Sequence, residues 1–503
     1  MIFVRANAKG LTALAALILV SMLLTACRSD VASASLSMQP TDEPVGEVSE
    51  ISSEPVHTPF PTRPDYSPGE LVDYIAKSGD TLPALASRFN TSVGEIMEAN
   101  PIIPAGATTM PPGMPMLIPI YFAPFWGTPF GILPDSHFIN GPAQVGFNTS
   151  DFVNQQPGWL RDFSTYVSGS NRTGAQVVDL IATHYSISPR LLLALLEFHS
   201  GALSRPTASL DEQMYPMGYR SRKDSGFYQQ LAWTANTLNN GYYNWRQGKL
   251  TLLEFFNGRL ERPDPEHTAA TAALQYYFSI IYPQEDYNFA ISPEGLYQVY
   301  TSLFGDPWLA DEAHIPGSLT QPEFLLPFEP HRTWALTGGP HTAWGEGEPL
   351  AALDFAPPSV AGGCIDTDQF ATAVAAGVIA RSETGIVVLD LDGDGDERTG
   401  WAVFYLHVGT ENRAPAGKVV AAGEPIGHPS CETGRSTGTH IHIARKYNGE
   451  WIPSEGPLAF NFEGWIAQNG SRPYLGTLTR HSQTVYASQS AATSSHITSD
   501  KQP

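Results

Sequence analysis

The sequence predicts a multidomain protein with a small βααβ module, an α-helical middle module and a β-rich module built on an antiparallel sheet. The chain has 503 residues, which corresponds to about three domains of about 150 residues each. Apolar residues recur every three or four positions between residues 82 and 100 and between 173 and 281, as core-facing helices require. The last third instead carries the apolar run Ile386–Leu389 and the strand-like segment Trp401–His407, and the 45 Gly and 42 Pro are typical of turns and β structure.

Composition and charge exclude two classes of protein. Hydrophobic residues make up 42%, aromatic residues 11% and charged residues 16%, which is enough apolar material for packed cores and excludes a wholly disordered chain. The 28 Lys and Arg against 50 Asp and Glu give a net charge of −22. A surface of this charge repels polyanions, so nucleic acid is not an expected partner.

The first 27 residues predict an export signal. Arg5 and Lys9 precede an apolar run, Leu11–Ala26, that is short for a membrane span. The run ends in Leu24-Thr25-Ala26-Cys27, which resembles the lipobox of bacterial lipoproteins. The resemblance implies that Cys27 is lipidated and becomes the N-terminus of an extracytoplasmic, lipid-anchored protein in the cell envelope. The alternative is an uncleaved anchor with an incidental cysteine.

Shifts in composition predict the domain boundaries. Residues 28–68 are rich in Ser, Pro and Glu and predict a disordered tether, and the Ser-rich residues 481–503 predict a disordered tail. Between them we expect a βααβ domain over residues 69–121, a linker over 122–172, a helical domain over 173–322 and a β-rich domain over 323–480.

The βααβ segment resembles a LysM domain. Apolar residues at helical spacing predict two short helices, with a turn and an N-cap at Gly79-Asp80. The resemblance rests on Gly79-Asp80-Thr81-Leu82, Ala86, Phe89, Ile96, Asn100 and the closing Pro112–Pro119. It implies binding of the N-acetylglucosamine-containing glycans of peptidoglycan through the loops around residues 79–81 and 100–103. The alternative is a small βααβ domain that has lost sugar binding.

The middle segment predicts a bundle of helices. Ser188-Pro189 starts a helix with Ser as N-cap and Pro at the first position, and Leu191–Glu197 is apolar all round and therefore buried. Further helical stretches are expected over Phe227–Leu238, Thr251–Phe255 and Thr268–Ile281.

This segment resembles the lysozyme-like domains of lytic transglycosylases and glucosaminidases. The resemblance implies that Glu197, at the end of the buried helix, is an acid that protonates a glycosidic oxygen. In those families Ser follows the Glu directly, whereas here Phe198 and His199 intervene before Ser200. The alternative is a wall-binding or packing domain in which Glu197 caps a helix end or pairs with a base. We expect His184 and His199 to be structural.

Five spaced residues in the last third carry the strongest chemical signal: His341, Asp354, His407, His440 and His442. Residues two apart on a strand share a face about 7 Å apart, so His440 and His442 point the same way. One can bind a metal while the other faces substrate. Two imidazoles and one carboxylate around an open position form a catalytic zinc arrangement, because structural sites fill all four positions.

These residues resemble the LytM or lysostaphin-type peptidoglycan endopeptidases, and more closely their beta-lytic metallopeptidase and staphylolysin branch, through the Gly-rich loop His341–Gly347. The resemblance implies that His341, Asp354 and His442 bind Zn²⁺ and that His407 and His440 are catalytic. It also implies a disulfide between Cys364 and Cys431, the pair that remains in an oxidising compartment.

The expected function is hydrolysis of peptide bonds in the stem or cross-bridge peptides of peptidoglycan. Zinc lowers the pKa of a bound water toward about 7, so that it attacks a peptide carbonyl at neutral pH. His440 would assist deprotonation of the water and His407 would hydrogen-bond the oxyanion, or these roles would be exchanged or shared. Two alternatives are a non-catalytic peptidoglycan-binding regulator of another wall hydrolase and a glycan-cleaving enzyme that uses Glu197. Tyr405, two residues before His407, is either a substrate contact or a core residue.

An acidic segment lies where a hairpin turn is expected, between the apolar run Ile386–Leu389 and the strand Trp401–His407. Asp390, Asp392, Asp394 and Asp396 alternate with other residues, including two glycines, as in calcium loops. Two interpretations stay open: a structural Ca²⁺ site and a solvated acidic turn.

Overall fold

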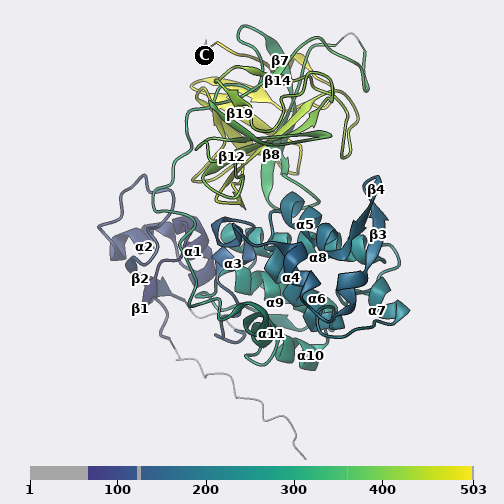
Figure 1. Ribbon diagram of the computed structural model, residues 1–503. Coiled ribbons are helices and arrows are strands. Elements are labelled where there is room, and N and C mark those ends of the chain that lie inside the picture. The colour runs from purple at the N-terminus through teal and green to yellow at the C-terminus, as the bar shows by residue number, and fades with distance from the viewer. Residues whose placement is uncertain (1–65, 122–125, 360, 501–503) are drawn as a thin grey trace, which may run out of the picture. The chain divides into compact units, whose positions relative to one another are not determined.

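The computed structural model describes residues 66–121, 126–359 and 361–500 (Figure 1). The predicted signal peptide, Cys27 and residues 28–65 of the predicted tether lie outside the described residues. Within the described ranges, no helix has the length and apolar character needed to cross a membrane.

The N-terminal module has the predicted βααβ order. Its elements are β1 (Glu70–Ile75), α1 (Leu82–Phe89), α2 (Val93–Ala99) and β2 (Pro115–Ile120). The two strands pair antiparallel, and Leu85, Phe89 and Ile96 are buried beneath them. The N-cap of α1 is Thr81, one residue after the predicted Gly79-Asp80 turn, because Asp80 is buried and accepts hydrogen bonds from Tyr74 and Arg88 instead.

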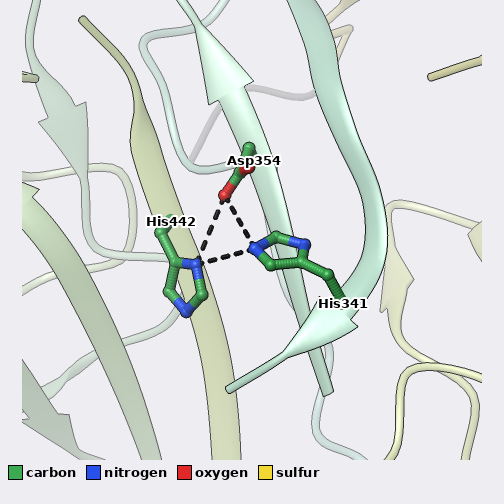
Figure 2. A group of neighbouring side chains, drawn as sticks. All are labelled: His341, Asp354 and His442. Atoms are coloured by element: carbon green, nitrogen blue, oxygen red, sulfur yellow. Dashed lines mark hydrogen bonds and ion pairs between the residues drawn. The ribbon is translucent and has the colours of Figure 1, made fainter. Parts of the chain in front are cut away.

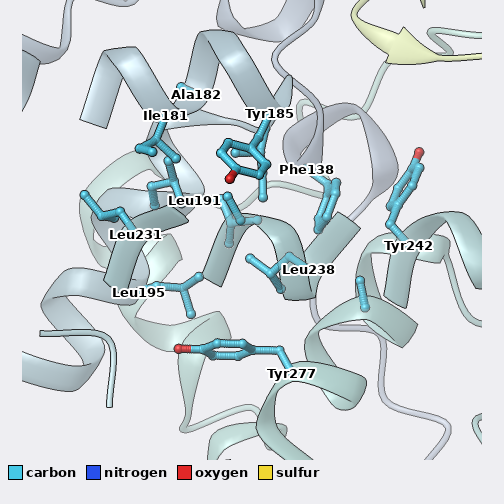
Figure 3. Close-up of a cluster of buried hydrophobic side chains, with 14 of the residues drawn as sticks. Phe138, Ile181, Ala182, Tyr185, Leu191, Leu195, Leu231, Leu238, Tyr242 and Tyr277 are labelled. Carbon is cyan, nitrogen blue, oxygen red and sulfur yellow. The ribbon is translucent and has the colours of Figure 1, made fainter. Parts of the chain in front are cut away.

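The middle module is helical, as predicted. Its helices are α3 (Asp135–Phe138), α4 (Thr149–Asn154), α5 (Gly174–Tyr185), α6 (Pro189–Ser200), α7 (Leu210–Met214), α8 (Phe227–Arg246), α9 (Ala269–Ile281), α10 (Gln284–Ala290) and α11 (Leu296–Phe304). Ser188 caps α6 by accepting a hydrogen bond from the Leu191 N–H, as the Ser-Pro signal predicts. The leucines of α6 are fully buried among α5, α8 and α9 (Figure 3).

Two sequence-based boundaries in this region are wrong. The predicted linker over 122–172 is instead part of the helical module from residue 130, because Phe130 packs on the helical core and Phe138, Trp159 and Leu160 are buried in it. These residues are scattered among Pro and Gly and show no helical period. The predicted helix Thr251–Phe255 is a short hairpin strand, β5 (Leu253–Glu254), paired with β6 (Leu260–Glu261). A second hairpin joins β3 (Ser164–Val167) to β4 (Ser170–Thr173).

The C-terminal module is built on an antiparallel sheet, as predicted. The strand order is β13-β10-β11-β12-β15-β8-β7-β21, with β16 paired to β15. Its strands are β7 (Thr333–Thr342), β8 (Leu350–Ala356), β10 (Gly377–Glu383), β11 (Gly385–Asp390), β12 (Trp401–Val408), β13 (Val419–Val420), β15 (Ile441–Tyr447), β16 (Glu450–Trp451) and β21 (His496–Thr498). Smaller sheets contain β9 (Ala371–Thr372) with β14 (Pro425–Gly427), and β17 (Asn461–Phe462), β18 (Trp465–Asn469), β19 (Gly476–Arg480) and β20 (Gln483–Tyr486).

The prediction of a disordered tail over 481–503 is wrong for the residues that the structure describes. Strand β20 pairs with β19, and β21 pairs with β7, where Ile497 lies opposite Trp334 and is buried. The Ser-rich composition conceals this, because an edge strand needs backbone hydrogen bonds and one buried apolar residue rather than an apolar run.

Both faces of the large sheet are buried. Ala352, Phe404 and Ala444 on one face belong to the same apolar cluster as the helical core. Leu353, Val403 and Ile443 on the other face pack with residues of the small sheet β17–β20. The central strands are therefore apolar at nearly every position, which is typical of strands covered on both sides.

Candidate metal centre and active-site cleft

Three adjacent strands bring His341, Asp354 and His442 together. Asp354 on β8 lies directly opposite His442 on β15, and His341 lies near the end of β7 after irregular pairing between Gly338 and His341. His341 Nε2 is 2.9 Å from His442 Nδ1, and each nitrogen is 3.3 Å from Asp354 Oδ1 (Figure 2). All three residues are buried.

Backbone carbonyls fix the protonation of both imidazoles. His341 Nδ1 lies 2.8 Å from the Gly339 oxygen, and His442 Nε2 lies 3.1 Å from the Ala343 oxygen. A carbonyl only accepts hydrogen bonds, so these ring nitrogens carry the protons. In the neutral rings His341 Nε2 and His442 Nδ1 therefore carry no proton. Their lone pairs point toward one another and toward the Asp354 carboxylate. Such a donor set fits a cation.

The local electrostatics also fit a cation. Asp354 Oδ1 is buried and has no hydrogen-bond partner of good geometry among the described residues. Burial alone would raise the pKa of Asp354, but the charges of His341 and His440 hold it well below its usual range. Burial would also lower the pKa of His341, but Asp354 outweighs this effect and raises it. Both shifts show that positive charge is favoured where the three side chains meet.

Gly338 leaves room for the carboxylate. It pairs with Asp354 across β7 and β8, and a Cβ atom at this position would overlap Asp354 Oδ2. The Gly338-Gly339 pair in the sequence therefore has a steric reason, since a side chain here would displace the carboxylate from the two imidazoles.

His440 and His407 complete the five-residue set. His440 Nε2 is 3.7 Å from Asp354 Oδ1, so His440 and His442 point to the same side, as their spacing predicts. The rings of His407 and His440 have centroids 4.5 Å apart. His440 Nδ1 lies 2.7 Å from the Gly438 oxygen and His407 Nδ1 lies 3.0 Å from the Glu432 oxygen. In both neutral rings the lone pair is therefore on Nε2.

His407 reaches the site only because its strand departs from regular geometry. Leu406 pairs with His442, so regular alternation would point His407 to the opposite face, with Tyr405. Instead His407 has φ +65°, and the pairing of β11 with β12 shifts register at Gly385. A left-handed conformation costs a non-glycine residue about 1–2 kcal/mol, and such strain is concentrated at functional sites.

Tyr405 is a core residue. Its side chain is fully buried and its hydroxyl accepts a hydrogen bond from the Val374 N–H at 2.9 Å. This decides between the two sequence-based interpretations, because the ring faces the small sheet rather than the histidines.

The five residues face a large cleft of about 2260 Å³. Its walls include the Gly-rich loop after His341, the segment around Cys364, and residues of α8 and the α7–α8 connection. Tyr474 also lines it and stacks on the His341 ring at a centroid distance of 4.1 Å. Sequence reasoning missed Tyr474, because it lies in a loop far from any of the five matched positions.

Helix α8 holds the Gly-rich loop. Asn236 Oδ1 and Asn240 Oδ1 accept hydrogen bonds from the Glu346 and Glu348 N–H groups, both at 2.7 Å. Lys249 adds an ion pair of 2.7 Å to Glu348. The helical module therefore fixes the loop that directly follows a predicted zinc ligand.

The predicted disulfide between Cys364 and Cys431 is present, with Cα atoms 5.8 Å apart. It links the segment after β8 to the segment before His440. Both segments are also joined by Thr439, whose hydroxyl accepts a hydrogen bond from the Ile365 N–H at 2.8 Å.

The acidic segment forms the predicted hairpin turn between β11 and β12. Carboxylate oxygens of Asp390, Asp392 and Asp394 come within 4.8 Å of one another. Asp396 is not part of this group, and its carboxylate pairs with Arg398 at 2.6 Å. Asp390 also accepts hydrogen bonds from the Gly393 and Gly395 N–H groups.

Glu197 is engaged by its own loop. Its carboxylate accepts hydrogen bonds from the Leu203 N–H at 2.7 Å, the Ser204 N–H at 3.1 Å and the Ser204 hydroxyl at 2.5 Å. It is not among the described residues that line the active-site cleft. These contacts agree with the alternative interpretation, in which Glu197 stabilises a helix end.

The two other histidines singled out in the helical segment have protein partners. His199 lies between the hydroxyls of Tyr277 and Tyr282, at 3.0 and 2.9 Å, and burial lowers its pKa to about 3. His184 packs against Trp344 with a centroid distance of 4.4 Å.

Segment 314–319 contacts the N-terminal module beside the first predicted sugar-binding loop. Ser78 exchanges hydrogen bonds with Ile315, and the Arg246 guanidinium donates to the Ser78 carbonyl. Thr109, in the α2–β2 connection, donates to the Pro316 carbonyl at 2.7 Å. Ile102, in the second predicted loop, is 82% exposed.

The C-terminal module is thus a β-rich domain in which three strands bring together two histidines and one aspartate, a donor set of the kind that catalytic metal sites use. Residues 74–119 match the LysM domain family, and residues 131–317 match the family described as LasA, N-terminal domain. The second match begins inside the predicted linker, in agreement with the helical module described above.

The chain is similar to protease LasA from two strains of Pseudomonas aeruginosa. It is 25% and 26% identical to them over 345 and 349 residues, which is 64% of this chain and 75% of each relative. Among solved structures, the deep-sea M23 metalloprotease pseudoalterin is 22% identical over 33% of this chain and 96% of its own, with a TM-score of 0.29. The catalytic domain of lysostaphin from Staphylococcus simulans is 21% identical over 25% and 89%, with a TM-score of 0.18.

Proposed function

We propose that the chain is an extracytoplasmic zinc endopeptidase that hydrolyses peptide bonds in the stem or cross-bridge peptides of peptidoglycan. One observation carries the proposal: lone pairs of His341 and His442 and the Asp354 carboxylate converge at one point beside an open cleft. Two imidazoles and a carboxylate with an open side form a catalytic zinc donor set. The similarity to protease LasA supports the same conclusion.

Zinc at this site would polarise the scissile carbonyl and acidify a water molecule. His440 and His407 lie beside the donor set with Nδ1 bound to backbone carbonyls, so the neutral rings offer Nε2 as a proton acceptor. Burial, followed by the neighbouring His440 and His442, lowers the pKa of His407 to about 4, which keeps it neutral at pH 7. Either ring can accept the proton of the attacking water and then, as imidazolium, donate a hydrogen bond to the developing oxyanion.

Three finer assignments belong to the same proposal. The LysM domain would hold the glycan of peptidoglycan and keep the enzyme on its substrate. Lipidated Cys27 would anchor the chain to the membrane. Ca²⁺ bound by Asp390, Asp392 and Asp394 would stabilise the hairpin between β11 and β12, and Asp396 would stay with Arg398.

The test is digestion of purified peptidoglycan with the wild-type chain and with His442→Ala, with and without a zinc chelator. Mass spectrometry of the products should show new free amines from cut peptides, and these should disappear with the chelator and in the variant. His481→Ala is the matched control, since His481 is exposed on the β19–β20 turn.

The same digest separates the two alternatives. A regulator of another hydrolase would bind no zinc and leave the peptides intact, which would overturn the proposal. A glycan-cleaving enzyme would release reducing sugar ends in the presence of chelator and lose them in Glu197→Gln. We expect Glu197→Gln to destabilise the helical module and to leave peptide cleavage intact, because its carboxylate binds its own loop.

A further inference from the structure

The active-site cleft has a second wall made of aromatic side chains. Most belong to the helical module, and one belongs to the Gly-rich loop of the β-rich module. We define this aromatic wall by five of the rings that line the cleft, those of the helical module and of the Gly-rich loop: Tyr185, Tyr219, Tyr228, Trp233 and Trp344.

One face of α8 opens into the cleft. Gln229, Ala232, Trp233 and Asn236 line it, and their spacing of three and four residues places them on one side of the helix. The Trp233 ring is stacked on Tyr219 at a centroid distance of 3.6 Å and an interplanar angle of 4°. Trp233 also contacts Tyr277, whose ring centroid is 5.9 Å away. The pair is therefore held in place while both rings stay partly exposed.

The cleft is larger than a peptide requires. Small-ligand sites in proteins have volumes of about 300–1,000 Å³. The cleft measures about 2260 Å³, so a short peptide at the predicted zinc ligands leaves more than half of the space free. The cleft therefore has room for a second bulky group of the substrate.

The side chains of the aromatic wall indicate which kind of substrate group binds there. A flat aromatic ring with one open face packs against the C–H face of a pyranose, and neighbouring amides and hydroxyls bind sugar hydroxyl and acetamido groups. Gln229 and Ser221 line the cleft beside Tyr228 and Trp233 and supply such groups. In peptidoglycan the peptide to be cut is joined covalently to a sugar.

We propose that the aromatic wall is a glycan subsite that binds the N-acetylated disaccharide to which the stem peptide is attached. This inference rests on the proposed function in one respect, because it takes the peptide to lie at His341, Asp354 and His442. The helical module would thus contribute substrate binding to the peptidase cleft, on a surface separate from the LysM domain.

The first experiment measures binding without catalysis. The full chain is footprinted with hydroxyl radicals in the presence of a peptide-free N-acetylglucosamine tetramer. We expect at least a twofold loss of oxidation at Trp233 and Tyr219. Tyr166, which is 71% exposed on β3, serves as the internal control and should not change. Because the readout is specific for each residue, sugar bound at the LysM domain does not produce the signal. Unchanged oxidation of Trp233 and Tyr219 would overturn the proposal.

The second experiment compares two substrates with the same peptide, one carrying the disaccharide and one without it. Wild type should prefer the glycosylated substrate, and Trp233→Ala should lower kcat/KM for it about tenfold while leaving the free peptide unchanged. Trp233→Tyr, which keeps a ring, should retain the preference, and Tyr166→Ala should behave as wild type.

Equal loss on both substrates would assign Trp233 a structural or peptide-binding role and overturn the glycan subsite. The absence of any preference in wild type would do the same. If wild type cleaves neither substrate, the proposed endopeptidase function fails, and the footprint alone then decides whether the wall binds glycan.

Discussion

Asp354 and His442 lie directly opposite one another on the neighbouring strands β8 and β15, with 3.3 Å between Asp354 Oδ1 and His442 Nδ1. Each side chain is held by strand pairing rather than by a loop. The Ala343 carbonyl accepts a hydrogen bond from the other ring nitrogen of His442, Nε2. The lone pair of Nδ1 therefore faces the carboxylate. The two side chains are thus already oriented for the metal that we propose they bind.

Replacing the carboxylate should remove the metal. Asp354→Asn keeps the shape but loses the charge that faces two imidazoles, so the zinc dissociation constant should rise by more than the roughly 10- to 100-fold that loss of an outer-shell partner costs. Zinc content per chain, measured by plasma mass spectrometry after dialysis, checks this. Asp366→Asn removes a charge from the same cleft and should keep its zinc. Full zinc occupancy in Asp354→Asn would contradict the assigned ligand set.

A second prediction concerns pH and a buried charge cluster. Glu450 accepts hydrogen bonds from Arg246 and Tyr242, and His314 Nε2 lies 2.7 Å away. Burial alone would raise the pKa of Glu450, but Arg246 and His314 lower it from 4.5 to about 2. Because the folded-state pKa is lower than the unfolded one, the carboxylate stabilises the fold above pH 4.5 and loses this contribution as the pH falls toward 2.

Glu450→Gln should therefore lower the free energy of unfolding by about 3 kcal/mol at pH 7. Its difference from wild type should shrink at pH 3, because the wild-type carboxylate then contributes less. Urea denaturation at the two pH values measures both effects. Glu254→Gln, at an exposed position, is the control. If the difference between Glu450→Gln and wild type grew toward low pH, the lowered pKa of Glu450 would be contradicted.

A third prediction tests the support of the Gly-rich loop by α8. Asn240→Ala removes the acceptor of the Glu348 N–H and the donor to the Glu346 carbonyl. The loop after His341 should become more mobile, which weakens binding of the peptide substrate by about 1 kcal/mol. KM should therefore rise about fivefold, without loss of zinc. Steady-state kinetics with a soluble peptide and zinc analysis separate the two effects. Asn244→Ala, one turn further along α8, is the matched control. A variant that loses zinc would show that the helix supports the ligands themselves.

A fourth prediction distinguishes packing from catalysis on β12. Tyr405→Phe keeps the ring in the core but leaves the Val374 N–H without its acceptor, which should destabilise the fold by about 1–3 kcal/mol. The kcat at 25 °C should stay within twofold of wild type. Thermal unfolding and peptide kinetics check these values. A large fall in kcat with unchanged stability would return Tyr405 to the list of substrate contacts.

The chemistry-bearing residues were predictable from sequence where regular geometry places them. The His440 and His442 pair follows from strand alternation, and the βααβ order of the N-terminal module follows from helical spacing. The position of His407 does not follow from alternation, because a left-handed residue and a register shift bring it to the opposite face. Such local exceptions depend on tertiary packing that no period in the sequence records.

Contacts between residues far apart in the sequence were the second feature that could not be predicted. The burial of Trp159 with the helical core and the pairing of Ile497 with Trp334 depend on residues far along the chain. Composition in a window of a few residues cannot reveal them, so one segment looked like a linker and the other like a tail. Tyr474 was missed for the same reason, since only the folded chain places it on His341.

His341, Asp354 and His442 project from three neighbouring strands of one sheet, β7, β8 and β15. Their separation is therefore set by the inter-strand distance of about 4.8 Å and not by the number of residues between them. Insertions or deletions in the connections beyond Ala343 would leave the centre unchanged as long as the strands still pair. Evolution and design can thus vary the rim of the cleft, and with it the choice of substrate, without rebuilding the centre beneath it.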